Sequence, residues 1–237
     1  MLRLIFFIPI LVISTTVCAI AALIGGIFNH YGSYATAVLR TWARSLLWAT
    51  GIKPEVVGLE NVEPDKSYIL IANHQSHMDI PVLTCGLPIP LRIIAKKELF
   101  RIPFLGWGMK AVGMLSIDRS NRKQSFETLK EAEEIIKTRR LSILAFPEGT
   151  RSNDGKIHPF KKGPFILAIN TGLPLLPVSV SGTRKIIPKG KISLREGRVK
   201  VYIHPPVATK NLTLGDRHKL VEELQIIIEK GFIENYE

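Results

Sequence analysis

The sequence predicts an α/β fold with a mostly parallel central sheet flanked by helices, preceded by an N-terminal membrane-associated helical segment. Residues 4–28 carry no charged side chain. After residue 50, short runs rich in Ile, Leu and Val alternate with amphipathic stretches, and such runs are typical of strands buried on both faces. We therefore expect N-terminal membrane-associated helices in residues 1–50 and an α/β domain in residues 51–237.

The N-terminal run is long enough to cross a bilayer. As a helix, Leu4–Phe28 would be about 38 Å long. Four interpretations stay open: a cleaved signal peptide, a lipoprotein anchored at Cys18, a spanning helix, or a monotopic hairpin broken at Pro9 and Gly25–Gly26. The next stretch, Tyr31–Thr50, combines aromatic residues with arginines, which suits a bilayer interface. Together they favour the membrane, although sparse basic residues leave the orientation open.

The domain after residue 50 shows strands and helices in alternation. We expect six strands, at Tyr68–Ala72, Leu91–Ala95, Met114–Ile117, Ser142–Phe146, Leu175–Val180 and Arg198–Ile203. Helices are expected at Ser125–Thr138, from Gly163 to Gly172, and at Leu214–Lys230. Ligands of such sheets bind beyond the carboxyl ends of the strands, so motifs at these ends are candidates for a site.

Composition limits the class of partner. The chain has 237 residues, and 46% of them are hydrophobic, so a packed core is expected and general disorder is not. The net charge of +12 points to an anionic partner: nucleic acid, an acidic membrane surface or a phosphorylated substrate. The two cysteines form neither a disulfide framework nor a zinc spacing, which fits a reducing compartment.

The first candidate motif, Asn73–Asp79, follows the first strand. Ser76 and Asp79 match a capping pattern, so Ser76 is expected to start a helix with Asp79 at its third position. On this motif alone, the cap is the leading interpretation. The functional alternative makes His74 a general base whose imidazole is oriented by Asp79. His74 and His77 lack a third ligand at an obvious spacing, so no metal site is expected.

Two further motifs lie at strand ends. Arg119 follows the third strand, where it is either a surface charge or a bidentate phosphate ligand. Phe146–Ser152 follows the fourth strand, with Pro147 ending the strand and Gly149 permitting a tight turn. The turn could be purely structural or could present its polar groups to a ligand, and the sequence leaves both interpretations open.

These motifs, in this order and at these intervals, resemble the glycerolipid acyltransferase family, most closely the bacterial 1-acyl-sn-glycerol-3-phosphate acyltransferases. The resemblance covers about residues 55–185. The residues that carry it are Asn73–Asp79, Ala95–Leu99, Ile117–Arg119, Phe146–Ser152 and the segment around Pro177. It implies a glycerol-3-phosphate acyltransferase-like fold. The implied reaction transfers a fatty acyl group from an acyl thioester to the sn-2 hydroxyl of 1-acyl-glycerol-3-phosphate (lysophosphatidic acid), making phosphatidic acid.

The resemblance also implies roles for single residues. His74 would be the general base and Asp79 would orient it, with no covalent acyl-enzyme. Lys96 and the backbone N–H groups near Gly149 are candidate oxyanion donors. The expected substrate-binding residues are Arg119, Glu148, Gly149, Thr150 and Arg151. No metal and no cofactor is implied, because acyl carrier protein or coenzyme A brings the acyl group as a co-substrate. The apolar stretch Leu99–Met109 is either core or the lining of an acyl-chain tunnel.

The implied partners are lysophosphatidic acid, the acyl carrier and an anionic membrane. The implied location is the bacterial inner (cytoplasmic) membrane, with the active site on the cytoplasmic side. Nucleic acid is not expected, since the basic residues lack interleaved aromatics. Three alternatives stay open: an acyltransferase with another acceptor, a hydrolase that activates water with the same pair, and a lipid-binding module in which His74 has no catalytic role.

Overall fold

The computed structural model describes residues 2–118, 120–139, 141–190 and 193–236. Within these ranges a seven-stranded sheet has the order β1-β7-β6-β2-β5-β3-β4, and β6–β7 is its antiparallel pair. The strands are β1 (Glu55–Val57), β2 (Ile69–Ala72), β3 (Leu91–Lys96), β4 (Leu115–Ile117), β5 (Ser142–Ala145), β6 (Leu175–Ser181) and β7 (Lys200–Ile203). This confirms the predicted fold class. The six expected strands all form, and β1 is an additional three-residue edge strand.

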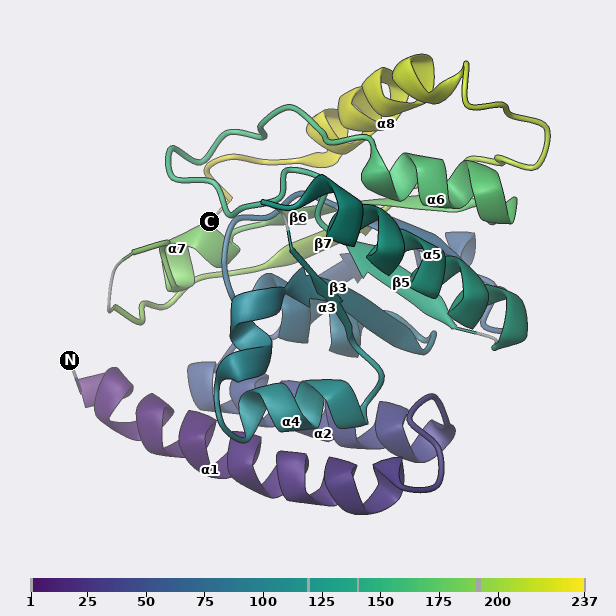
Figure 1. Ribbon diagram of the computed structural model, residues 1–237. Helices are drawn as coiled ribbons and strands as arrows, with labels where there is room; N and C mark the ends of the chain where they lie inside the picture. Colours follow the sequence, from purple (N-terminus) through teal and green to yellow (C-terminus); the bar gives the residue numbers. More distant parts are fainter. Residues whose placement is uncertain (1, 119, 140, 191–192, 237) are drawn as a thin grey trace.

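Helices cover both faces of the sheet (Figure 1). The helices are α1 (Leu2–Gly26), α2 (Ser33–Thr50), α3 (Asp79–Gly86), α4 (Leu105–Ala111), α5 (Arg122–Thr138), α6 (Gly163–Thr171), α7 (Thr183–Ile186) and α8 (Arg217–Gly231). Helices α5, α6 and α8 lie on one face, while α2 and α3 lie on the other, with α1 and α4 outermost. Two short 3₁₀ turns, Leu59–Asn61 and Lys97–Arg101, complete the elements.

The core lies in two layers because successive side chains of a strand point to opposite faces. In β2, Ile69 and Ile71 join the apolar cluster under α5, α6 and α8, whereas Leu70 and Ala72 join the cluster under α2 and α3. All four are 0% exposed. The near-continuous apolar runs of the sequence therefore reflect strands that are buried on both sides.

The N-terminal region is a helical hairpin in which α1 runs to Gly26 and α2 returns beside it (Figure 1). Pro9 lies inside α1 and does not end it, so of the positions considered for a hairpin the chain turns after Gly25–Gly26. The inner face of α1 packs closely on α4, since a Cβ on Gly108 would lie 3.1 Å from the Cα of Ala19. The boundary expected at residue 50 stays a prediction, but Leu46 of α2 belongs to the same core as β2.

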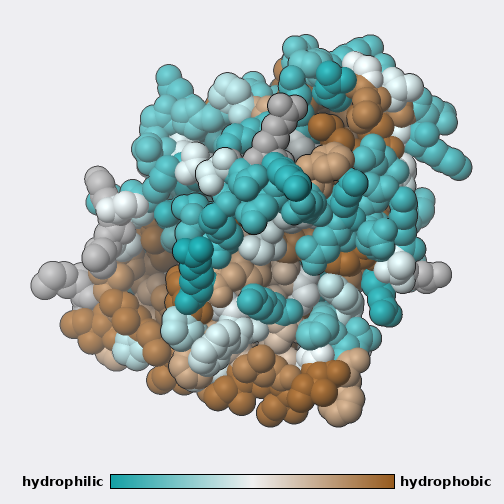
Figure 2. Space-filling model, viewed as in Figure 1, coloured by the Kyte–Doolittle hydropathy of each residue, from teal (hydrophilic) through white to brown (hydrophobic). Residues whose placement is uncertain are grey.

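The outer face of α1 is apolar and exposed, and Figure 2 shows hydrophobic side chains along the edge of the molecule where α1 lies. The exposed apolar residues of this region are Ile5, Phe6, Ile8, Val12, Ile13, Val17, Ile20, Leu23, Ile24, Ile27 and Phe28. Of the helices in the described ranges, the segment Arg3–Gly26 is long and apolar enough to cross a membrane, with a mean hydropathy of 2.6.

Candidate active site

The site begins where β2 ends beside β6. The two strands pair in parallel, with Ala72 opposite Val178. The buried side chain of Asn73 then continues the pairing: its Nδ2 donates to the carbonyl oxygen of Val180 at 2.9 Å, and its Oδ1 accepts from the Val180 N–H at 2.8 Å. These two bonds fix the position of the chain directly before His74.

His74 and Asp79 form a hydrogen-bonded pair, with 2.7 Å between Nδ1 and Oδ2. Oδ2 of Asp79 also accepts from the backbone N–H groups of Gln75 at 2.7 Å and Ser76 at 2.8 Å. The Asp79 side chain is 0% exposed. An ionised carboxylate only accepts hydrogen bonds, so Nδ1 of His74 carries the proton and the lone pair of Nε2 is left to act as a base.

The start of α3 differs from the expectation. The helix begins at Asp79 after the N-cap residue Met78, so Ser76 is not the N-cap. Its Oγ instead accepts from the Met78 N–H at 3.2 Å and donates to the carbonyl oxygen of Ile187 at 2.8 Å. The prediction of Ser76 as the N-cap was wrong, whereas the Asp79 carboxylate accepts the Ser76 N–H, which is the bond that the capping pattern predicts for it. His77 is exposed and lies outside the pair.

The Phe146–Ser152 loop supports His74 directly. The rings of His74 and Phe146 stack, with centroids 4.0 Å apart and an interplanar angle of 17°. The His74 N–H donates to Oε1 of Glu148 at 2.7 Å, and the His74 carbonyl oxygen accepts from the Ser152 N–H at 2.9 Å. Two motifs that are about 70 residues apart in the sequence therefore form one site.

Glu148 is a buried carboxyl group whose partners are backbone amides. Its second oxygen, Oε2, accepts from the His158 N–H at 3.1 Å. Burial raises the pKa of Glu148 to about 7, although both amide bonds act in the opposite direction. Among the hydrogen bonds and ion pairs of the described residues, Glu148 has none with Arg151.

The rest of the loop faces solvent beside the pair. Gly149 has the left-handed φ of 75° that its turn requires. Lys189 donates to Oγ1 of Thr150 at 3.1 Å and to the carbonyl oxygen of Arg151 at 2.7 Å. The Arg151 guanidinium is half-buried; burial lowers its pKa, and the charge of Asp79 acts against this. That attraction places Arg151 within electrostatic range of the pair.

Two expected residues remain, Lys96 and Arg119. Lys96 ends β3 with an exposed ammonium group, 3.3 Å from Oε1 of Glu98, and its role as an oxyanion donor stays a prediction. Arg119 lies outside the described residues. Its neighbour Asp118 is bonded by Lys97 and Ser120, and these two hydrogen bonds hold the pKa of Asp118 well below its usual range.

Two buried residues next to the pair, Thr183 and Gln75, were not predicted from the sequence as part of the site. Thr183, at the start of α7, donates from Oγ1 to Oδ1 of Asp79 at 2.5 Å. Nothing in its own sequence surroundings marks it, except that it follows a strand end. Gln75 is 1% exposed, and in the described ranges neither polar atom of its side chain has a hydrogen-bond partner. Leaving buried polar groups unpaired costs about 1–3 kcal/mol each, so packing alone does not explain a glutamine there.

A small cavity of about 200 Å³ adjoins the pair through Phe146. It lies at the carboxyl ends of β3, β4 and β5 and is lined by Ile94, Ile117, Ser125, Leu129, Ala145, Phe146, Pro147, Gly149, Lys161, Gly163 and Pro164. The exposed ammonium of Lys161 gives this mostly apolar hollow a cationic rim. Within the described part of the chain, no group of three His, Cys, Asp or Glu side chains is placed to hold a metal ion.

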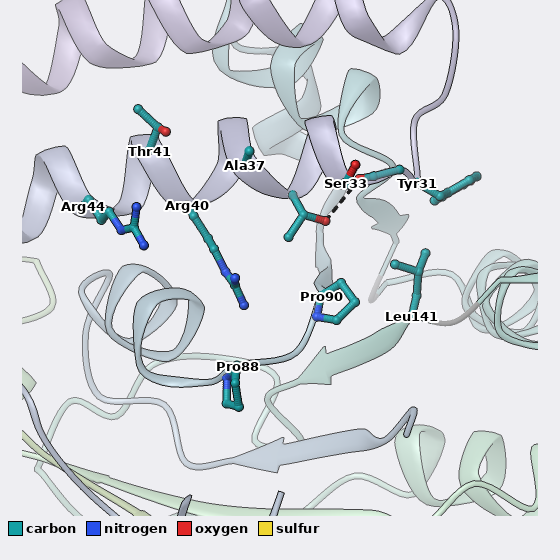
Figure 3. A pocket seen from close by; sticks show the side chains of 11 residues that line it. Tyr31, Ser33, Ala37, Arg40, Thr41, Arg44, Pro88, Pro90 and Leu141 are labelled. Atoms are coloured by element: carbon teal, nitrogen blue, oxygen red, sulfur yellow. Dashed lines mark hydrogen bonds between the residues drawn. The ribbon is translucent and has the colours of Figure 1, made fainter. Parts of the chain in front are cut away.

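A larger hollow of about 510 Å³ lies beneath α2, near the opposite ends of β3 and β5 (Figure 3). Arg40 extends into it, and its Nη2 donates to the carbonyl oxygens of Leu87 at 3.0 Å and Ile89 at 3.2 Å. These bonds tie α2 to the chain that leaves α3. We therefore interpret Arg40 as structural.

The geometry of the His74–Asp79 pair is that expected of a general base, a group that removes a proton from a hydroxyl group or a water molecule. Residues 53–181 match the family model described as Acyltransferase. The chain belongs to this acyltransferase family.

Similar proteins share one name. The chain is 35% identical over 205 residues to the chloroplastic 1-acyl-sn-glycerol-3-phosphate acyltransferase BAT2 of Brassica napus, covering 84% of this chain and 57% of that protein. It is 38% identical over 187 residues to a 1-acyl-sn-glycerol-3-phosphate acyltransferase of Saccharomyces cerevisiae, covering 78% and 61%. The chain thus spans about three fifths of these relatives.

A solved structure resembles the whole fold. It is the 1-acyl-sn-glycerophosphate (LPA) acyltransferase PlsC of Thermotoga maritima, with a TM-score of 0.83 and 30% identity. The match covers 97% of this chain and 93% of that one. The similarity therefore includes the N-terminal hairpin as well as the sheet.

Proposed function

We propose that this protein transfers a fatty acyl group from an acyl thioester, carried by acyl carrier protein or coenzyme A, to the sn-2 hydroxyl of 1-acyl-glycerol-3-phosphate. The product is phosphatidic acid. The observation that carries the proposal is the His74–Asp79 pair, a buried carboxylate 2.7 Å from Nδ1 in a member of the acyltransferase family. The names of the relatives support the choice of acceptor.

The proposed mechanism needs no nucleophile from the enzyme. Nε2 of His74 takes the proton of the acceptor hydroxyl as its oxygen attacks the thioester carbonyl carbon. The new C–O ester bond forms, the C–S bond breaks, and the imidazolium returns its proton to the leaving sulfur. The carrier therefore leaves as a thiol. The carboxylate of Asp79 stabilises the imidazolium between these two steps.

Further proposed roles follow from the charges that develop in this reaction. Arg151 and Arg119 are proposed to hold the acceptor phosphate, since a guanidinium binds phosphate in a bidentate manner. Lys96 and the N–H groups near Gly149 remain the proposed oxyanion donors. Thr150 is proposed to bind the acceptor. Glu148 is proposed to hold the backbone of His74 in place, since it accepts the His74 N–H.

We also propose that an anionic bilayer is a partner, with α1 lying in its interface. The exposed apolar face of α1 supports contact with lipid. Contacts between α1 and both α2 and α4 hold α1 along the body of the protein, which favours a monotopic arrangement over a spanning one. The proposed location is the cytoplasmic face of a bacterial inner membrane. Membrane fractionation and protease accessibility in spheroplasts test it.

An acyl-transfer assay in detergent tests the function. Lysophosphatidic acid is offered with acyl-acyl carrier protein and with acyl-coenzyme A, and the wild type is compared with His74→Ala. We expect His74→Ala to lose at least about 100-fold in kcat, as for removal of a general base. The matched control is His218→Ala, an exposed histidine on α8, with unchanged turnover. Thiol release without acceptor would instead identify a hydrolase, and full activity of His74→Ala would refute the mechanism.

A further inference from the structure

Thr183 is the one side chain in the described ranges whose hydroxyl reaches the catalytic carboxylate. Its Oγ1 donates to Oδ1 of Asp79 at 2.5 Å, and both side chains are 0% exposed. Oδ2 takes the other three donors, which are Nδ1 of His74 and two backbone N–H groups. Each oxygen of the carboxylate therefore has its own partners, and the orientation of the carboxyl plane depends on Thr183.

The fold brings Thr183 to this position from about 100 residues away. Thr183 follows β6, whose end is fixed to the end of β2 by the bonds between Asn73 and Val180. Between them, Gly182 turns the chain with a left-handed φ of 90°. A Cβ at Gly182 would lie 2.0 Å from the Arg198 carbonyl oxygen, so the turn requires glycine. The hydroxyl is thus aimed by the backbone.

The segment after Thr183 also joins the two motif loops. The carbonyl oxygen of Ile187 accepts from Oγ of Ser76 at 2.8 Å. Arg184 donates to the Asn153 carbonyl oxygen at 2.9 Å, and Lys189 bonds the neighbouring Arg151 carbonyl at 2.7 Å. This segment lies just beyond residues 53–181, the range of the family match. Its hydrogen bonds therefore connect the loop that carries His74 and Asp79 with the loop that follows β5.

We propose that Thr183 is a positioning residue of the reaction. Its hydrogen bond holds the Asp79 carboxylate so that Oδ2 faces Nδ1 of His74, which keeps Nε2 unprotonated and aimed at the acceptor hydroxyl. A hydrogen bond to an ionised carboxylate is about twice as strong as one between neutral groups. If the carboxylate rotated in this buried site, no solvent molecule would replace the hydrogen bonds that it lost. The proposal rests on the proposed function, because it assigns His74 as the base.

The test compares Thr183→Val with Thr183→Ser in the acyl-transfer assay. Thr183→Val keeps the shape and removes the donor, and we expect kcat to fall about tenfold or more with the acceptor KM changed less than about twofold. Thr183→Ser restores the donor and should recover most of the rate. The matched control is Thr209→Val, a buried threonine whose hydroxyl bonds the carbonyl oxygens of Ala168 and Leu173. It should keep wild-type kcat.

A double-mutant cycle separates positioning from a merely structural role. In an Asp79→Ala background the Thr183 hydroxyl has no carboxylate to bind. Thr183→Val should therefore no longer change kcat. An undiminished effect there, or wild-type kcat in Thr183→Val itself, would overturn the inference. If His74→Ala retains turnover, the proposed function fails. If only Thr183→Val is silent, the function stands and this inference alone fails.

Discussion

Titration of the buried carboxyl group of Glu148 should make the free energy of unfolding depend on pH. Its side chain bonds two backbone N–H groups, of His74 and His158, from a site that is 5% exposed. Burial raises its pKa from 4.5 to about 7 in the folded protein. Between these two values the native state binds a proton that the unfolded chain has already released. The folded state is therefore favoured at the acidic end of this range.

The size of the effect follows from the two pKa values. One pKa unit corresponds to about 1.4 kcal/mol, so the difference between 4.5 and about 7 corresponds to about 3 kcal/mol. This stabilisation is fully present below the unfolded pKa of 4.5 and is lost as the pH rises through the folded pKa of about 7. The free energy of unfolding of the wild type should thus contain a falling component across this range.

Glu148→Gln removes the titrating proton and should remove that component. The variant should be less stable than the wild type at acidic pH, because a single amide oxygen replaces two oxygens that each accept an N–H bond. Urea unfolding at a series of pH values, followed by far-ultraviolet circular dichroism in detergent, measures both effects. Glu222→Gln, at an exposed glutamate on α8, is the control and should keep the wild-type slope. A slope equally steep in Glu148→Gln would refute the reasoning.

Three further changes have effects that the structure defines. Asn73→Ala leaves two buried backbone groups of β6 unpaired and should lower the free energy of unfolding by about 2–6 kcal/mol, measured by urea unfolding. Gly58→Ala puts a Cβ 2.0 Å from a carbonyl oxygen of β7 at a φ of 87°, and should lower the melting temperature by several degrees, at a cost of about 1–3 kcal/mol or more. Arg151→Ala and Arg119→Ala should each raise the acceptor KM about tenfold or more, with an unchanged KM removing the phosphate role of that arginine.

The strands of the sheet could be predicted because the residues that mark a strand lie within one short stretch of sequence. A strand buried on both faces, such as β2, is apolar at every position, and a turn at its end is visible in the next few residues. The start of α3 was misplaced for a related reason. The capping pattern predicts the bond from the Ser76 N–H to Asp79, but it does not show that the same carboxylate also takes the Gln75 N–H or that the helix begins only after Met78. Helix α4 was missed because its seven residues lack an apolar stripe.

The site could be predicted only as far as its motifs are continuous in sequence. His74 and Asp79 are five positions apart, and their pairing follows from a turn. The bond from the His74 N–H to Glu148 depends on strand register, and so does the bond from Thr183 to Asp79. Register is fixed by the packing of the whole sheet, which no single stretch of sequence contains. The contacts of Glu148 with the His74 and His158 N–H groups could not be predicted for this reason, and its role in substrate binding stays a prediction.

The geometry of Asp79 shows why ordering of the turn before α3 and the proposed catalytic role cannot be separated at this residue. One oxygen, Oδ2, takes the N–H groups of Gln75 and Ser76 together with Nδ1 of His74. The amides order the turn before α3, and the same order brings the imidazole into reach. A substitution at Asp79 therefore disturbs the turn and the base at once, and a loss of activity there has two causes. Thr183 contacts only the other oxygen and none of the turn amides, so its hydroxyl offers the cleaner measure of how much rate depends on carboxylate orientation.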